Sequence, residues 1–484
     1  MALDILKNPV LLIAVPLLLA FLAVFLKKID KALLWIAAVA NAASAVLLAV
    51  VYQGMTVVEL GGFKPPFGIS LVLDEYSLIG VVVLNVLFAL ILLLSGKLVK
   101  QYATVLLVAL AALNGIILTG DLFNLFVFLE IAAIAAYIFT AMDKGFKHSF
   151  NYLVVGTLGS GLYLFGIILL YNIFGSLNMF DIRAQLQAIG GAGAETLTLP
   201  LVMIFTGLSV EAKLMPFGGW VKGVLHKANS LVGTMIVSGY ALAVLLAVGR
   251  LMDTVFQMTD AVLIAFTAVA VGTLIFAEAS AFSKKNLREI LLFSSVAQAG
   301  LVVLLFLYGL TVPAVLVLVN NVVSKFVLFT VAGRLAHALE TDDIGELKGV
   351  FVKVPLVGVG FTVAVMSLIG LPLFFGFVAK INALVGLFNA GNVWLPLIIL
   401  VMAVVEGAYF VRILTTLWNT GEEGEVSSRD NLKAFNLDGM KGLGVVSVGI
   451  AIVIVALGIL PVLNIKQFFS VDFMTFVQQL LGGM

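Results

Sequence analysis

The chain has 484 residues, of which 62% are hydrophobic and 11% are charged, and its formal net charge is +1. A soluble domain carries roughly 25% charged residues, so the composition excludes a soluble globular protein and predicts an all-α protein that crosses a membrane many times. A near-neutral chain without a basic tract has nothing to attract nucleic acid. With no cysteine and three histidines, we expect no metal site and no cofactor.

In chain order, fourteen runs are apolar and long enough for a membrane-spanning helix, which needs about 20 residues. They lie near residues 8–26, 33–53, 75–96, 101–119, 121–142, 149–174, 197–218, 230–250, 258–282, 289–309, 311–338, 352–388, 393–418 and 443–463. We expect the first run to be kept rather than cleaved as a secretion signal, because it is too long and lacks a small-residue cleavage site. The runs at 197–218 and 352–388 contain Pro216 and Pro372, so both helices are expected to break.

The basic residues test this arrangement, because they collect on the cytoplasmic side of membrane proteins. The connections that follow odd-numbered runs carry eighteen of them: Lys27, Lys28, Lys31, Lys97, Lys100, Lys144, Lys147, Lys222, Lys227, Lys284, Lys285, Arg288, Arg334, Lys348, Lys353, Arg429, Lys433 and Lys441. The opposite side, termini included, carries five: Lys7, Lys64, Arg183, Arg250 and Lys466. This asymmetry predicts a multi-pass protein of the cell membrane with both termini outside.

Several charged residues remain inside the spans, where a charge at the bilayer centre costs roughly 2.5–3.5 kcal/mol. They are Lys213, Lys325, Lys380, Arg412, Glu130, Glu211 and Glu406, with Glu278 nearer the end of a span. Two interpretations are open: structural ion pairs that fix helix packing, or a relay that takes up and releases protons or other ions. The relay is favoured because several such residues occur together and because two of the lysines lie near a predicted helix break, where backbone groups commonly line ion paths.

Four segments carry a resemblance to a known family. They read GDLFNLFVFLE from Gly120, KKNLREILLFSSVAQAGL from Lys284, NNVVSKFVLFTVAGRLAH from Asn320 with DDIGELKGV after it, and SLIGLPLFFGFVAK from Ser367. Together they resemble the D-type subunit of Mrp antiporters and the antiporter-like subunits of respiratory complex I, over about residues 75–415.

The resemblance implies about fourteen transmembrane helices with two inverted five-helix repeats, helices 4–8 and 9–13, and with helices 7 and 12 broken. The chain would then consist of an N-terminal three-helix segment (1–100), a first repeat (101–250) and a second repeat (251–418). The remaining residues, 419–484, would form a cytoplasmic loop, the last helix and an amphipathic tail.

The resemblance also implies where an ion relay lies. By motif, Glu130 matches the glutamate of helix five, Lys325 the lysine of helix eleven and Lys380 the lysine of helix twelve. His337 matches a histidine at the end of helix eleven, and His226 matches one that follows helix seven. Glu406 has no counterpart in the motifs, and we include it in the relay because of its comparable depth.

The first half of this relay departs from the family pattern. The helix-seven lysine position holds Glu211, and the nearest lysine is Lys213. Two residues turn a helix by about 200°, so Lys213 reaches the same path only if the helix is already unwinding; on that basis we expect it to form a buried pair with Glu130. Ala243 and Asn321 occupy positions where the family carries a lysine and a histidine. The middle of the relay therefore has fewer ionisable residues than in the family.

Three functions remain open at this stage. The first is an H⁺- and/or Na⁺-translocating subunit of a Mrp antiporter or of an archaeal hydrogenase- or sulfur-reductase-type respiratory complex. The second is a scaffold of such a complex that has lost conduction, as the thinned relay would allow. The third is a stand-alone solute transporter, which the specific motifs disfavour. Expected partners are Mrp-like small subunits, another antiporter-like subunit and a peripheral Fe–S redox arm, since this cysteine-free chain carries no redox or catalytic centre.

Overall fold

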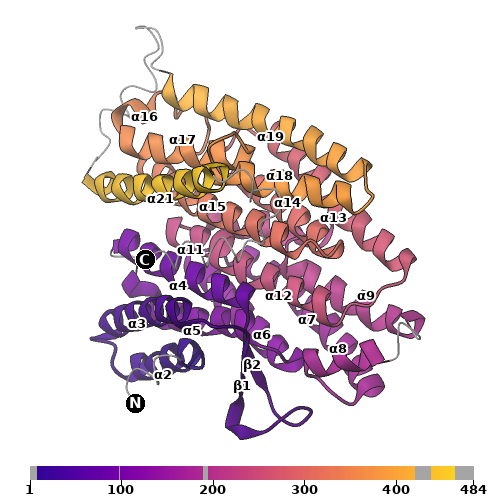
Figure 1. The fold of residues 1–484 in the computed structure, drawn as a ribbon. Coiled ribbons are helices and arrows are strands. Elements are labelled where there is room, and N and C mark those ends of the chain that lie inside the picture. The colour runs from indigo at the N-terminus through magenta and orange to yellow at the C-terminus, as the bar shows by residue number, and fades with distance from the viewer. Residues whose placement is uncertain (1–7, 97–98, 189–193, 420–437, 464–484) are drawn as a thin grey trace. The chain divides into compact units, whose positions relative to one another are not determined.

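The structure, a computed structural model, describes residues 8–96, 99–188, 194–419 and 438–463. These residues are almost entirely helical (Figure 1). The helices are α2 (Leu11–Phe25), α3 (Asp30–Val51), α4 (Glu75–Ser95), α5 (Val99–Leu118), α6 (Leu122–Met142), α7 (Phe146–Phe174), α8 (Met179–Ala188), α9 (Ala194–Glu211), α10 (Trp220–Lys227), α11 (Ser230–Met235), α12 (Ala241–Thr254), α13 (Asp260–Ser283), α14 (Leu287–Leu307), α15 (Thr311–Leu339), α16 (Val350–Lys353), α17 (Pro355–Ile369), α18 (Phe375–Asn389), α19 (Trp394–Trp418) and α21 (Asp438–Leu463). Most of the expected cytoplasmic loop (420–437) and the amphipathic tail (464–484) lie outside the described residues.

Eleven of the described helices are long and apolar enough to cross a membrane. Three shorter apolar helices, α2, α17 and α18, have 15 residues each. Each of the fourteen predicted apolar runs falls on these helices or on α9. The prediction of an all-α, multi-pass membrane protein is therefore confirmed.

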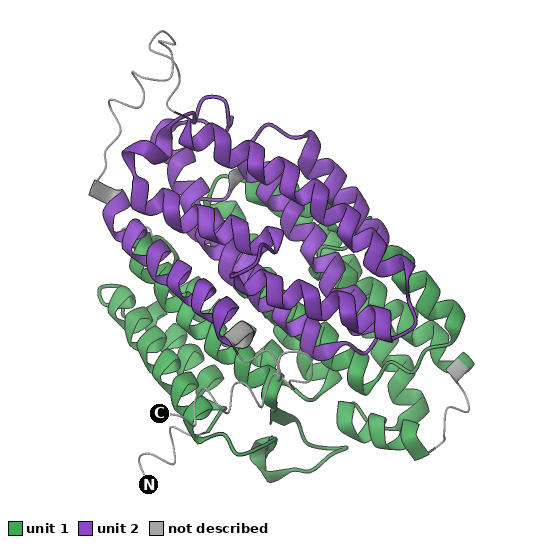
Figure 2. Cartoon of the chain, turned by 45° about the horizontal axis from the view of Figure 1, so that its top comes forward, with its two compact units in different colours: residues 1–227, 239–270 green, residues 228–238, 271–484 purple. Residues whose placement is uncertain are grey.

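The chain forms two compact units, coloured separately in Figure 2. The first contains residues 1–227 and 239–270, and the second contains residues 228–238 and 271–484. In the first unit α7 packs along α9, and α5 packs against α2 and α6. The close approach of α7 and α9 depends on small residues, because a Cβ added to Gly207 would lie 2.5 Å from the carbonyl oxygen of Gly159. In the second unit α15 packs against α14, α17 and α18, and α17 packs along α21.

Both predicted helix breaks are present. α9 ends at Glu211 before a short 3-10 turn and α10, and α17 ends at Ile369 before α18 begins at Phe375. In each case two successive N–H groups bond back across the last turn, which is a common way to end a helix. These donor–acceptor pairs are Lys213–Val210 and Leu214–Ser209 in the first unit, and Gly370–Ser367 and Leu371–Met366 in the second.

Two features were not anticipated from the sequence. Strand β1 (Thr56–Glu59) pairs antiparallel with β2 (Ser70–Leu73) in the connection between α3 and α4. Residues Ile236–Tyr240, between α11 and α12, form a π-helical turn. Such turns are rare and occur frequently at functional sites.

Candidate functional site

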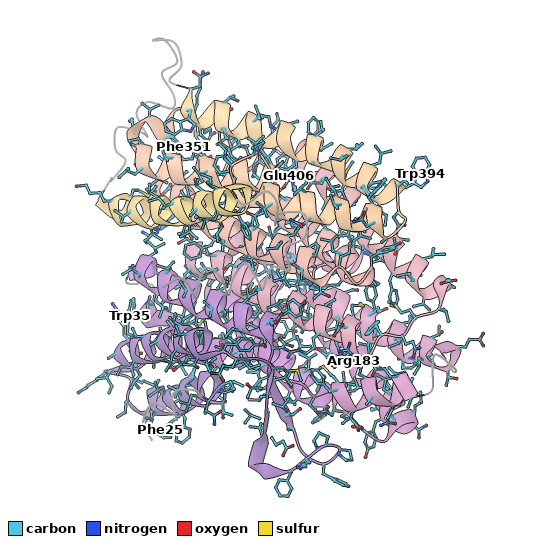
Figure 3. All side chains as sticks on the ribbon, in the orientation of Figure 1. Phe25, Trp35, Arg183, Phe351, Trp394 and Glu406 are labelled. Carbon is cyan, nitrogen blue, oxygen red and sulfur yellow. The ribbon has the colours of Figure 1, made fainter. Side chains whose placement is uncertain are left out.

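The break between α17 and α18 holds a buried ion pair in the second unit. Lys380, on α18, points its Nζ at the carboxylate of Glu406, 2.6 Å away, and at the carbonyl oxygen of Ile369, 3.2 Å away. The two side chains are 12% and 2% exposed. Glu406 lies midway along α19, whose first residue is Trp394 (Figure 3). Lys380 is therefore held inside the helix bundle by a charge and by a free helix-end carbonyl, and it does not extend to the surface.

The sequence around the break explains why the lysine sits there. Gly370 adopts φ = 86° at the end of α17, a left-handed conformation that favours glycine. Gly376 lies so close to α17 that an added Cβ would overlap the carbonyl oxygen of Ser367. The hydroxyl of Ser367 accepts the N–H of Gly376 at 3.0 Å and donates to Asn320 on α15 at 2.6 Å. The break is thus fixed against α15 by polar contacts.

Two helices supply further partners for the buried charges. Gln298, on α14, donates through Nε2 to Oε1 of Glu406 at 3.0 Å. Lys325, on α15, is fully buried and donates to the hydroxyl of Ser294 at 2.6 Å and to the carbonyl oxygen of Leu291 at 3.3 Å. Its Nζ also lies 5.4 Å from the centre of the Phe410 ring on α19, within range of a cation–π interaction.

A second acid belongs to this group although the sequence had placed it near a helix end. Glu278, on α13, is 1% exposed and interacts electrostatically with Glu406, Lys380 and Lys325. Its Oε2 is buried without a hydrogen-bond partner, and the buried hydroxyl of Tyr409 lies beside the carboxylate. Further buried polar atoms without a partner belong to Asn321, Ser324 and Ser295. Groups of this kind are normally satisfied by ordered water, so the cluster is suited to holding and exchanging protons.

The first unit contains two acids that lie close enough to interact. Glu130 lies on α6 and Glu211 is the last residue of α9, and the two carboxylates interact electrostatically. The hydroxyl of Tyr152, on α7, donates to Glu211 at 2.8 Å. The Tyr152 ring stacks on Trp220, with 3.5 Å between ring centres. One further oxygen of each carboxylate, Oε1 of Glu130 and of Glu211, is buried without a partner.

Lys213 makes no direct hydrogen bond to Glu130, and the expected buried pair, which could include a bridge through one water, stays a prediction. Lys213 is 2% exposed, and its Nζ has no hydrogen-bond partner among the described residues. The physical reason lies in the backbone. α9 ends at Glu211, and Lys213 takes φ = 64°, so its side chain leaves the chain in a direction that helical spacing does not predict. Glu130 instead interacts electrostatically with a second acid, Glu211.

The two predicted histidines are not brought to these clusters by the described contacts. His337 is exposed in the last turn of α15, twelve residues after Lys325 and therefore about 18 Å along the helix. His226 lies on α10, and its side chain falls outside the described residues. Arg412 is exposed and donates to the carbonyl oxygen of Lys284 at 2.8 Å, a structural contact. Among the described residues, no three metal-ligating side chains come together.

Three residues of this cluster were not predicted from the sequence as members of the relay: Glu278, Gln298 and Tyr409. Glu278 was noted only as lying nearer the end of a span, and it stands five residues before the end of α13. Gln298 entered only as part of a family motif. A signal was nevertheless available, because Gln298 follows Ser294 by four residues and therefore lies on the same face of α14.

Comparison with known proteins supports the helical, multi-pass membrane architecture. A family model described as NADH:quinone oxidoreductase/Mrp antiporter, transmembrane, matches residues 119–405, more than half of the chain. NADH-quinone oxidoreductase subunit N of Desulforudis audaxviator is 29% identical over 85% of this chain and 87% of its own. The D-type subunit of the Na⁺/H⁺ antiporter of Bacillus subtilis is 27% identical over 88% of this chain and 90% of its own.

A solved structure gives the same result at the level of the fold. The chain is similar to one from the membrane-bound sulfane sulfur reductase, an archaeal respiratory membrane complex. The TM-score is 0.84 at 28% identity, over 96% of both chains. The resemblance drawn from the four sequence segments is therefore confirmed. The chain belongs to the NADH:quinone oxidoreductase/Mrp antiporter family of transmembrane proteins and is an antiporter-like membrane subunit.

Proposed function

We propose that the chain translocates H⁺ and/or Na⁺ through a buried relay of glutamates, lysines and water. Lys325, Lys380 and Glu406 form its part in the second unit, and Glu130, Glu211 and Lys213 form its part in the first. His226 and His337 are candidates for the ends of the path. A lysine and a glutamate can each be loaded and unloaded near neutral pH when burial destabilises their charged forms.

The observation that carries the proposal is the contact of Lys380 with both Glu406 and a free carbonyl at a helix break. A structural ion pair needs only the carboxylate. The additional carbonyl gives the ammonium a second acceptor, so the lysine can keep its proton while the bond to Glu406 lengthens. A buried side chain of this kind inside a membrane is rare unless it serves an ion path.

The wider setting is proposed on the same basis. The named relatives are subunits of larger membrane assemblies, and we infer that this chain works beside Mrp-like small subunits and another antiporter-like subunit. A peripheral Fe–S arm would supply any redox chemistry, since the chain has no cysteine. We place it in the cell membrane with both termini outside, and we assign residues 101–250 and 251–418 as the two inverted repeats.

The test is ion flux in vesicles that contain the intact complex, with H⁺ and Na⁺ measured separately. Lys380→Met removes the ammonium while keeping much of the side-chain volume, and we expect it to abolish coupled flux without preventing assembly. Lys353→Met, which changes an exposed lysine on α16, is the matched control and should conduct normally. Full flux in Lys380→Met would refute the relay.

A second function is favoured by one observation. Glu211 and the unpaired Lys213 interrupt the first half of the relay, as expected of a scaffold subunit that holds a complex together without conducting. Glu130→Gln separates the two functions in the same assay. A conducting subunit should lose flux in this variant, whereas a scaffold should show the same flux as the unmodified complex for both Glu130→Gln and Lys380→Met.

A further inference from the structure

Glu278 is a buried acid that none of the family motifs includes. It lies on α13, is 1% exposed, and leaves Oε2 without a hydrogen-bond partner. An ionised carboxylate in such a place is costly unless it is paired or hydrated. Its presence beside two lysines and a second glutamate therefore calls for a physical account.

The contacts along α14 show that the buried charges lie along one face of this helix. Ser294 binds Lys325, and Gln298, one helical turn later on the same face, binds Glu406. Residues four apart on a helix are separated by about 6 Å. Lys325 and Glu406 are thus neighbours along one helix face, and each is bound by a different side chain of that helix.

Glu278 and Tyr409 lie in the same region. The charged groups that act on Glu278 are Glu406, Lys380 and Lys325, and Tyr409 interacts with it and with Glu406. Tyr409 follows Glu406 by three residues on α19 and precedes Phe410, whose ring contacts Lys325. Its hydroxyl is buried and lies next to the Glu278 carboxylate and the Ser294 hydroxyl. Glu278 and Tyr409 therefore belong to the same cluster as Lys325, Lys380 and Glu406, and Oε2 of Glu278 has no hydrogen-bond partner.

We propose that Glu278, acting with the hydroxyl of Tyr409, carries protons between Lys325 and the Glu406–Lys380 pair. The inference rests on the proposed function, because it adds a step to that relay. The Lys325 ammonium gives a proton to the Glu278 carboxylate, leaving a neutral amine and a neutral acid. Glu278 then passes a proton to the Tyr409 oxygen as the tyrosine gives its own to Glu406, so that Tyr409 is unchanged. Glu406 finally protonates Lys380, provided that Lys380 has already released its proton onward.

A static role for Glu278 is the competing explanation. In that case the carboxylate stays ionised and only balances the charge of the two lysines. The two roles differ in one measurable property, because a carrier must be protonated during turnover whereas a counter-charge must not. Infrared difference spectroscopy of the complex detects the C=O stretch of a protonated carboxylic acid directly.

The experiment compares Glu278→Gln, Glu278→Asp and Tyr409→Phe with the unmodified complex in the same vesicles. Asp260→Asn is the matched control, since it removes an exposed carboxylate from the start of the same helix. We expect Glu278→Gln to lower flux by about tenfold or more, in line with the loss of a proton-transfer group. Glu278→Asp should restore part of it, and Tyr409→Phe should give an intermediate loss. A carboxylic-acid band present during turnover should disappear in Glu278→Gln.

Two outcomes overturn the inference while leaving the proposed function intact. One is normal flux in Glu278→Gln together with loss of flux in Lys380→Met. The other is a loss of flux in Glu278→Gln with no change in the carboxylic-acid band, which assigns Glu278 a static role. Full flux in Lys380→Met would instead refute the proposed function, and the inference with it. Size-exclusion chromatography of each variant measures assembly and so tests whether a loss of flux is caused by misfolding.

Discussion

A single residue, Lys213, combines an unusual backbone conformation with a buried charge. It occupies the position after a helix end where glycine is usual, because the chain takes a left-handed conformation there. Its ammonium is also buried without a hydrogen-bond partner among the described residues. Both features raise the energy of the folded chain. Unfavourable residues of this kind cluster at functional positions, where the surrounding structure maintains them.

This conformation leads to a prediction about stability. Lys213→Gly removes a left-handed non-glycine residue and a buried ammonium, so we expect the free energy of unfolding to rise by more than about 1 kcal/mol. Lys144→Gly is the matched control, because Lys144 has φ = 61° at the end of α6 but is exposed. Thermal unfolding of the purified complex should show a gain for both variants and a larger gain for Lys213→Gly. A loss of stability in Lys213→Gly would mean that the ammonium has a favourable partner.

At the level of elements, one arginine ties together the ends of three helices in the first unit. Arg250, near the end of α12, donates to the carbonyl oxygens of Ile117 and Thr119, at 2.9 and 2.8 Å, where α5 ends. It also binds Asp74 at 3.0 Å. Asp74 caps α4 by accepting the N–H of Ser77. The cap, the ion pair and the helix-end carbonyls are therefore a single polar junction.

The charge state of Asp74 makes the stability of this junction depend on pH. Burial alone would raise the pKa of Asp74, but the Arg250 guanidinium and the bonds from Ser77 outweigh burial and hold the pKa below its ordinary value. A lowered pKa stabilises the folded state above the ordinary value of about 3.9, and the contribution is lost as the pH falls through the folded pKa.

We therefore expect Asp74→Asn to lower the free energy of unfolding by about 2 kcal/mol at pH 7, the size of a charge-assisted bond. The difference from the unmodified protein should shrink as the pH falls below about 4. Thermal unfolding as a function of pH measures both, with Asp260→Asn as a control for general charge effects. A difference that stays constant down to low pH would contradict the assigned ion pair.

At the level of the whole molecule, the sequence predicts the helices better than the contacts between them. Apolar run length locates the spans, and Pro216 and Pro372 locate the breaks, because both are local properties of the chain. The pairing of Lys380 with Glu406 is not local, since 26 residues and a helix connection separate them. The position of Glu278 along its helix likewise did not predict its burial, because nearness to a helix end does not say which neighbours cover the side chain.

The distribution of basic residues predicts an orientation for the entire chain. Lys64, in the connection between β1 and β2, belongs to the side with few basic residues, whereas Lys285, between α13 and α14, belongs to the side with many. Both residues are exposed. Positive residues favour the cytoplasmic side, so the first should face outward and the second inward.

The absence of natural cysteine makes this orientation directly measurable. Lys64→Cys and Lys285→Cys each introduce the only thiol in the chain, which a membrane-impermeant maleimide can label. We expect Lys64→Cys to react in intact cells and Lys285→Cys to react only after the membrane is permeabilised. The unmodified chain gives the background, and labelling after denaturation shows that both thiols are present. Because the odd and even connections alternate along the chain, the reverse pattern would invert every span and place both termini in the cytoplasm.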